Sequence, residues 1–304
     1  KSLSRYCCLL GPNVASLSIA EHFSFLMTNR IPRRLVTRVL GRISRIESPM
    51  LARCLIRLWQ WFDADLRLDE SSASNFRSLN ECFIRPIKPQ LRPIDFGEDK
   101  LTSPCDGIVV SCGVVADGQL FQAKGMPYYM SDLMPNADLA DRYEGSTFVT
   151  IRLKPGFYHR FHAPIAGSID RVEYMYGDTW NVNPIALKRI QQLYCRNERA
   201  AMEIVGSEFS CVLAPIAAVL VASLQIHGIN QPLDLSLGKN KTFHLKAEVV
   251  QGQELGYFQH GSTIILFVDA RFTKCGDWAE GDRINMGQSI FRLETQKERN
   301  GYEV

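Results

Sequence analysis

A Gly-Ser-Thr tripeptide occurs twice in this chain of 304 residues, once at residues 145–147 and once at residues 261–263. A serine between a flexible glycine and a stiff β-branched residue can attack the carbonyl group that precedes it, because glycine reaches strained backbone conformations that other residues avoid. Such an attack cuts the chain and turns the serine into a different chemical group. The tripeptide is short, so other residues must show which copy, if either, is reactive.

Two histidines in the segment RLKPGFYHRFHAPIAG are candidates for acid–base chemistry. The segment contains Tyr158, His159 and His162. Histidine titrates near neutral pH, so either ring can act as a general base or a general acid. A metal site built on the pair lacks an evident third ligand, and we predict none. Two partly buried histidines that are hydrogen-bonded to the backbone are the structural alternative.

An Asp-Gly pair precedes an apolar stretch in TSPCDGIVV. Asp-Gly sequences favour turns, so Asp106 can be simply a turn residue. A carboxylate at this point can also orient a histidine, as it does in a Ser-His-Asp arrangement. These residues alone leave both interpretations open.

The first part of the chain has the pattern of basic amphipathic helices. In RRLVTRVLGRISRI and MLARCLIRLWQWF the apolar residues recur every three or four positions, and arginines fall mostly between them. Such helices, with tryptophans, suit a membrane surface in which the apolar face enters the headgroup region and arginines meet anionic lipid. A helical layer packed on the protein's own core is the alternative.

Strand patterns dominate after residue 101. Short apolar or alternating runs are separated by Gly, Pro, Asp and Asn, and we expect one helix at residues 184–194 that is capped by Asn181 or Asn183. Ser78 and Glu81 fit a capping box. The expected fold class is therefore α+β: a β-rich catalytic domain at residues 76–304 follows a helical membrane-docking region and linker at residues 1–75.

The composition narrows the class of protein. Hydrophobic residues make up 46% and charged residues 22%, as in ordinary folded proteins, and the net charge of +3 predicts neither a global electrostatic partner nor a nucleic acid. Nine cysteines without a Cys-x-x-Cys pair argue against a disulfide framework or a zinc ribbon, and favour a reducing compartment. No run of about 18 apolar residues predicts a spanning helix.

Several motifs together resemble the phosphatidylserine decarboxylase family. They are SPCDGIV, LKPGFYHRFHAP, WNVNP, RNER and the late FQHGST, in the family's order, and the similarity covers roughly residues 76–295. The resemblance implies a chain that cuts itself between Gly261 and Ser262, where Asp106 orients His162 and His162 deprotonates Ser262. The products are a large chain of residues 1–261 and a small chain of residues 262–304. The early tripeptide lies where the family has an ordinary strand start.

The resemblance also implies the catalytic chemistry. Ser262 becomes a pyruvoyl group, the only cofactor that is needed, and its ketone forms a Schiff base with the amine of phosphatidylserine. Carbon dioxide leaves, and protonation and hydrolysis release phosphatidylethanolamine. His159 is the candidate for assisting decarboxylation or reprotonation, with Tyr158 as a second candidate. His260 departs from the family, in which an apolar or small residue usually precedes the glycine.

The resemblance implies partners and a location as well. The substrate stays in a bilayer, so the basic helices at residues 33–62 are expected to dock on an anionic lipid surface without spanning it. A homodimer is expected. We expect a peripheral protein on the cytoplasmic face of the bacterial inner membrane, with the mitochondrial inner membrane as the alternative.

Three other functions compete with this interpretation. A Ser-His-Asp hydrolase would keep Ser262 intact, but no Gly-x-Ser-x-Gly sequence surrounds that serine. A membrane-binding β-domain would carry the tripeptide without chemistry. A decarboxylase with the same mechanism could act on another amino acid or on a lipid with a different tail. The number and mass of the chains separate most of these functions.

Overall fold

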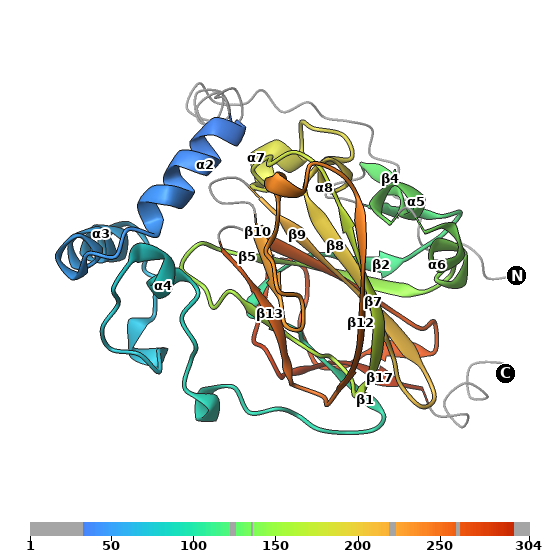
Figure 1. Ribbon diagram of the computed structural model, residues 1–304. Coiled ribbons are helices and arrows are strands. Elements are labelled where there is room, and N and C mark those ends of the chain that lie inside the picture. Colours follow the sequence, from blue (N-terminus) through green and yellow to red (C-terminus); the bar gives the residue numbers. More distant parts are fainter. Residues whose placement is uncertain (1–32, 122–125, 135, 219–222, 260–261, 295–304) are drawn as a thin grey trace, which may run out of the picture.

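An eight-stranded antiparallel sheet forms the centre of the molecule in the computed structural model, which describes residues 33–121, 126–134, 136–218, 223–259 and 262–294 (Figure 1). The strand order is β12-β7-β8-β9-β14-β5-β2-β16. The strands are β2 (Gly107–Val114), β5 (Thr147–Leu153), β7 (Gly167–Met175), β8 (Arg199–Val205), β9 (Ser210–Ala217), β12 (Lys241–Val249), β14 (Ser262–Val268) and β16 (Arg283–Ile284).

Strand β14 lies in the interior of this sheet and pairs with β5 on one side and with β9 on the other. Ser262, its first residue, lies opposite Leu153 and Ala217. All seven residues of β14 are buried, which explains the continuous apolar run STIILFV: a strand that is covered on both faces has no polar side. The pairing therefore fixes the position of the late serine from both sides.

Two smaller sheets cover one face of the central sheet. The four-stranded sheet has the order β11-β10-β13-β6 and the three-stranded sheet has the order β1-β17-β15. Ile151, Ile264, Leu224, Phe258 and Phe291 belong to the core on this side. The strands are β1 (Lys100–Thr102), β6 (Arg160–His162), β10 (Ser223–Ile226), β11 (Leu233–Asp234), β13 (Glu254–Phe258), β15 (Phe272–Lys274) and β17 (Ser289–Leu293).

Short helices and a hairpin cover the opposite face. Ile265 and Phe267 of β14 point to this second core, because successive side chains of a strand point to opposite faces. Instead of one helix at residues 184–194, two short helices form, and Gln192 between them has a left-handed backbone with φ of 53°. Asn183 caps the first of them, as expected. The elements are β3 (Gln119–Phe121), β4 (Pro127–Tyr129), α5 (Met130–Leu133), α6 (Ala137–Arg142), α7 (Pro184–Leu187) and α8 (Leu193–Arg196).

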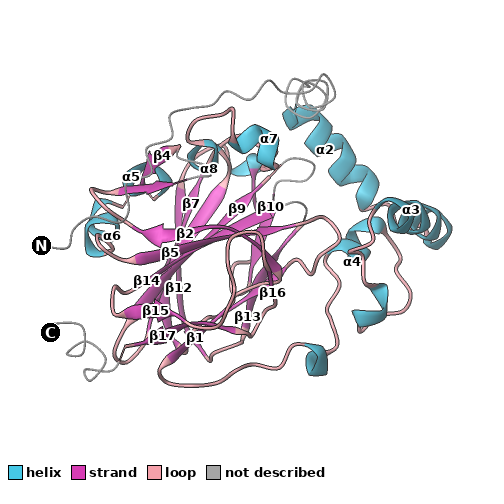
Figure 2. Cartoon of the chain, turned by 180° about the vertical axis from the view of Figure 1, so that it is seen from behind, coloured by secondary structure: helices cyan, strands magenta, loops and turns pink. Residues whose placement is uncertain are grey.

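The helical region lies along one side of the β-rich body (Figures 1 and 2). Helix α3 packs against α4 through Ala52, Ile56 and Cys82. The Ser78 hydroxyl accepts the backbone N–H of Glu81, as expected for the start of α4. The prediction of a β-rich body is confirmed, and no helix among the described residues is long and apolar enough to cross a membrane. The remaining elements are α2 (Arg33–Ser44), α3 (Pro49–Phe62), α4 (Leu79–Phe83), η1 (Leu68–Glu70), η2 (Pro89–Leu91) and η3 (Leu235–Leu237).

Candidate active site

Ser262 is fully buried at the first position of β14, and its hydroxyl meets a histidine. The distance from Ser262 Oγ to His159 Nδ1 is 3.3 Å, and both side chains have no exposed surface. His159 follows the loop that leaves β5, the strand opposite Ser262. The pairing of β14 with β5 therefore brings together two residues that are 103 positions apart in the sequence.

The contacts of His159 select one tautomer. Its Nε2 lies 3.0 Å from the carbonyl oxygen of Lys154 and 3.1 Å from that of Pro155. A carbonyl oxygen only accepts hydrogen bonds, so Nε2 carries the proton and Nδ1 has the lone pair that accepts from the Ser262 hydroxyl. The ring also stacks on Phe83 with centroids 4.0 Å apart. His159 is therefore buried and presents Nδ1 to the Ser262 hydroxyl.

Residues far away in the sequence hold the loop that carries these carbonyl groups. The Arg85 guanidinium donates to the Gly156 carbonyl at 2.9 Å, and Lys154 Nζ donates to Asp65 at 2.9 Å. A Cβ atom on Gly156 would lie 2.7 Å from a carboxylate oxygen of Asp63, so the loop passes too close to the chain for any side chain. The motif pattern gave no sign of these supporting residues.

His162 forms a separate pair with Tyr158. The Tyr158 hydroxyl lies 2.9 Å from His162 Nε2, and the Gly252 carbonyl oxygen lies 2.9 Å from Nδ1. The carbonyl requires a donor, so Nδ1 carries the proton and Nε2 accepts from Tyr158. Burial lowers the pKa of His162 and raises the pKa of Tyr158. Both groups are therefore neutral near pH 7.

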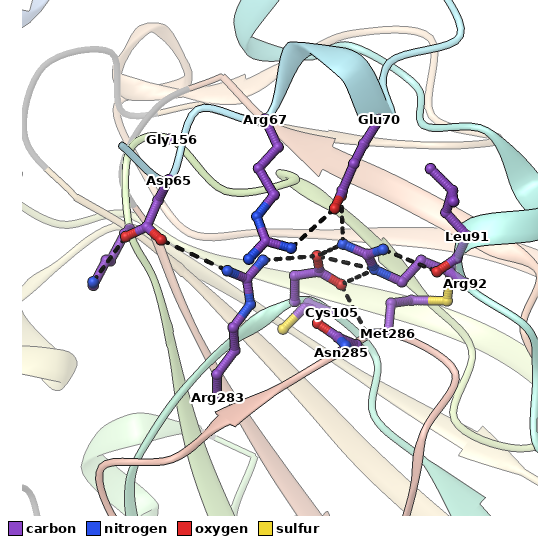
Figure 3. Close-up of polar contacts among 12 residues, drawn as sticks. Asp65, Arg67, Glu70, Leu91, Arg92, Cys105, Gly156, Arg283, Asn285 and Met286 are labelled. Carbon is purple, nitrogen blue, oxygen red and sulfur yellow. Dashed lines mark hydrogen bonds and ion pairs between the residues drawn. The ribbon is translucent and has the colours of Figure 1, made fainter. Parts of the chain in front are cut away.

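Asp106 is buried and pairs with Arg92 in an ionic cluster. Figure 3 shows Arg92, Glu70 and Arg283 of this cluster. Arg92 Nε donates to its Oδ1 at 2.8 Å, and the backbone N–H of Met286 donates to the same oxygen at 2.9 Å. Arg283 lies 3.8 Å from the other carboxylate oxygen. Glu70 accepts from Arg92 at 2.7 Å, and the hydrogen bond to Asp106 is the largest cause of the raised pKa of Arg92.

Among the described residues, none of the hydrogen bonds of the expected Asp106–His162–Ser262 triad is formed: His162 bonds to Tyr158 and Gly252, and Ser262 contacts His159. Across the described residues, Asp106 bonds to Arg92 and Met286 but neither to His162 nor to Ser262. The segments that carry Asp106 and His162 are nevertheless neighbours, because the backbone N–H of His162 donates to the Pro104 carbonyl at 2.8 Å. Gly261 and His260 lie outside the described residues, so the geometry of the peptide bond to be cut is not described.

The early tripeptide has different surroundings. Ser146 is buried just before β5, but its hydroxyl has no hydrogen-bond partner among the described residues.

The described part of the chain holds no group of three or more histidine, cysteine or acidic side chains that could bind a metal ion.

A buried serine at a strand start, within hydrogen-bond distance of a buried histidine, is the arrangement of a site in which a base faces a potential nucleophile. Comparison with known proteins gives the particular family. Residues 79–292 match the family described as phosphatidylserine decarboxylase. The chain belongs to the phosphatidylserine decarboxylase family.

Individual relatives agree over most of their length. The chain is 31% identical to the phosphatidylserine decarboxylase proenzyme of Brevibacillus brevis over 269 residues, which are 87% of this chain and 95% of the relative. It is 31% identical to the proenzyme of the same name from Shewanella baltica strain OS155 over 287 residues, with 88% and 96% covered. A third proenzyme, from Shewanella sp. strain ANA-3, is 32% identical over 286 residues, with 88% and 95% covered.

Proposed function

We propose that this chain cuts itself between Gly261 and Ser262 and then decarboxylates phosphatidylserine to phosphatidylethanolamine. The observation that carries the proposal is the buried contact of 3.3 Å between Ser262 Oγ and His159 Nδ1 at the start of β14. Membership of the family and the word proenzyme in the names of its relatives support the same function.

The maturation begins with an attack by Ser262 Oγ on the carbonyl carbon of Gly261. The C–N bond breaks, the nitrogen gains the hydroxyl proton, and an ester replaces the amide. Loss of the α-proton of residue 262 and departure of the Gly261 carboxylate from Cβ leave dehydroalanine. Water then replaces the nitrogen as ammonia, and a pyruvoyl ketone remains at the new chain start. A strained glycine backbone makes the uphill first step easier.

We assign the first proton transfer to His162, with Asp106 behind it, as the resemblance implies. His162 is a neutral base because burial lowers its pKa. In the described arrangement its Nε2 accepts from Tyr158, and the Ser262 hydroxyl points at His159. The assignment therefore requires the serine side chain to turn from His159 to His162.

A second assignment makes His159 the base for both stages. The 3.3 Å contact favours it, because a base must lie within hydrogen-bond reach of the proton that it removes. The two assignments differ in one result: replacement of His159 stops the cut in the second assignment and leaves it intact in the first.

The site suits a pyruvoyl group at residue 262. The group has about the volume of the serine that it replaces, and the surroundings are buried and dry, with Phe83 stacked on His159. When formed, it would supply an electron sink for the electron pair that remains on the α-carbon of an amino acid as carbon dioxide leaves. We propose that His159 Nδ1, which faces this position, holds the proton that returns to the substrate carbon after carbon dioxide leaves. Tyr158 is the second candidate for that role.

The mass of the purified protein and the release of carbon dioxide test the proposal together. We expect chains of 261 and 43 residues, with a pyruvoyl group at the start of the smaller one, and carbon dioxide released from phosphatidylserine in mixed micelles. A cut that gives chains of 145 and 159 residues would assign the chemistry to the early tripeptide. One uncut chain that hydrolyses esters would replace the proposal with a hydrolase.

We further propose that α2 and α3 dock on an anionic membrane surface. The two helices expose several large apolar side chains, among them Leu35, Met50, Trp61 and Phe62, the last two about four-fifths exposed. Single exposed apolar residues are common on protein surfaces, but a group of large ones is typical of an interaction site. Arg53 and Arg57 of α3 are also exposed. A peripheral location follows from this proposal, and the homodimer remains a proposal that sedimentation equilibrium can test.

Sedimentation with vesicles tests the docking surface. We expect Trp61→Ser combined with Phe62→Ser to lower binding to phosphatidylserine-containing vesicles about tenfold or more, because two exposed aromatic side chains no longer enter the headgroup region. Phe96→Ser is the matched control, since Phe96 is 67% exposed outside the helical region. Equal loss of binding in the control would contradict the proposed surface.

A further inference from the structure

Arg152 is a partly buried arginine on the strand that pairs with β14. It lies on β5 directly opposite Thr263, the residue after Ser262. Burial lowers its pKa, yet within the described part of the chain its guanidinium has no carboxylate or carbonyl partner. Buried arginines elsewhere in the molecule are paired: Arg199, for example, donates to the carbonyl groups of Leu133 and Cys195. A desolvated cation without an anion is unfavourable.

Three buried hydroxyl groups on the same face of the sheet also have no hydrogen-bond partner among the described residues. They belong to Thr150, Thr263 and Tyr194. Thr263 faces Arg152 across the strand pair, and Thr150 lies two positions earlier on β5, so its side chain points to the same face. Tyr194 is close enough to act on the pKa of Arg152. Buried polar groups are normally paired, so these hydroxyl groups are donors that an acceptor from outside the chain can use.

An anion with several oxygen atoms fits these donors. A guanidinium binds phosphate and carboxylate groups through two hydrogen bonds, and hydroxyl groups can donate to the remaining oxygens. The proposed substrate carries both kinds of anion. A cation on the carboxylate would stabilise the substrate more than the transition state, because that charge disappears as carbon dioxide forms. The phosphate keeps its charge throughout, so a cation there positions the substrate without slowing the reaction.

We propose that Arg152, together with the hydroxyl groups of Thr263 and Tyr194, binds the phosphate of the phosphatidylserine headgroup. The proposal rests on the proposed function. The reacting amine of the headgroup is four bonds from the phosphorus atom. On β5, Arg152 is the neighbour of Leu153, which lies opposite residue 262 of β14. Ser262 and Thr263 point to opposite faces of the sheet, so in this proposal the headgroup passes the end of β14 to reach both residue 262 and Arg152.

Binding of headgroup fragments tests the site directly. Calorimetry and inhibition assays on the mature protein compare three ligands. Glycerophosphoethanolamine has a phosphate but no carboxylate. Inorganic phosphate lacks the amine, and ethanolamine lacks the phosphate. We expect Arg152→Gln to weaken glycerophosphoethanolamine at least about tenfold and to raise KM more than it lowers kcat, with Arg152→Lys in between. Arg171→Gln is the control: it removes an arginine from β7, where the side chain is 49% exposed.

The outcomes separate the inference from the proposed function. An unchanged glycerophosphoethanolamine affinity in Arg152→Gln, with a normal melting temperature, overturns the inference even if the wild type releases carbon dioxide. Binding that Arg152→Gln abolishes supports the anion site even if no decarboxylation occurs. Inorganic phosphate that binds as tightly as glycerophosphoethanolamine identifies a site for free phosphate and overturns the headgroup assignment.

Discussion

The two Gly-Ser-Thr copies lie at opposite ends of one strand pair and differ in what surrounds them. The early copy leads into β5, and the late copy leads into β14, which runs antiparallel to β5 so that Val268 lies opposite Thr147. Both serines are buried. Ser262 contacts His159, whereas the Ser146 hydroxyl has no hydrogen-bond partner among the described residues. The two copies therefore share their sequence and their burial, and they differ in whether a histidine that could act as a base meets the serine hydroxyl.

The largest expected effect comes from removing each serine in turn. Ser262→Ala should leave one uncut chain and lower decarboxylation by about 10⁴-fold or more, because neither the nucleophile nor the later ketone exists. Ser146→Ala should be cut and active as in the wild type. Intact mass and carbon dioxide release measure both. Decarboxylation by the Ser262→Ala protein would break the comparison.

Replacing each histidine sharpens the comparison at the late copy. His159→Gln should lower decarboxylation about 10²- to 10⁴-fold, because it removes the group that faces residue 262. With the maturation assigned to His162, we expect His159→Gln protein to be cut and His162→Gln protein to remain largely uncut. Denaturing electrophoresis of both variants over time gives the answer. The reverse pattern would assign the maturation to His159.

Strand β2 pairs with β5 along its length and so runs from the late copy to the early copy. Asp106 directly precedes β2, at the end near the late copy. Ile108 pairs with Arg152, while Val114 pairs with Thr147 near the early copy. Asp106→Asn should lower the free energy of unfolding by about 3 kcal/mol, because it leaves buried arginines without their anion. Asp95→Asn, which breaks an exposed pair with Lys100, should change the free energy of unfolding far less, because solvent screens exposed pairs. Equal costs in chemical denaturation would contradict a structural role for the cluster.

The smallest expected effect is a pH dependence at the late copy alone. Because burial lowers the pKa of His162, the ring stays neutral down to pH values below its ordinary value of about 6.5. The rate of the cut should therefore be flat from pH 8 to about 6.5 and fall only at lower pH. The unfolded chain binds this proton more readily, so acid also reduces the stability of the fold. A rate that falls already between pH 8 and 7 would exclude His162 as the base.

Local patterns predicted much of this arrangement. Apolar runs predicted the strands, Ser78 and Asn183 were expected as caps, and the motif order singled out the late copy. The contacts that support the site could not be predicted in the same way. Arg85 and Asp65 contact the histidine loop from more than 70 positions away in the sequence. Arg92 reaches Asp106 from a loop that has no periodic pattern. Only the folded chain brings these residues to the site. The break at Gln192 needed a backbone angle that the helical pattern does not encode.

The register of β14 has a consequence for the life of the molecule. Side chains alternate along a strand, so a shift of one residue against β5 would turn Ser262 to the face away from His159. The chain can therefore acquire its reactive group only after the central strand has inserted between β5 and β9 in the correct alignment. In the proposed mechanism, self-cleavage therefore depends on correct folding: a chain with a misaligned β14 would remain uncut and inactive, and every cut molecule would have assembled its core before the cut.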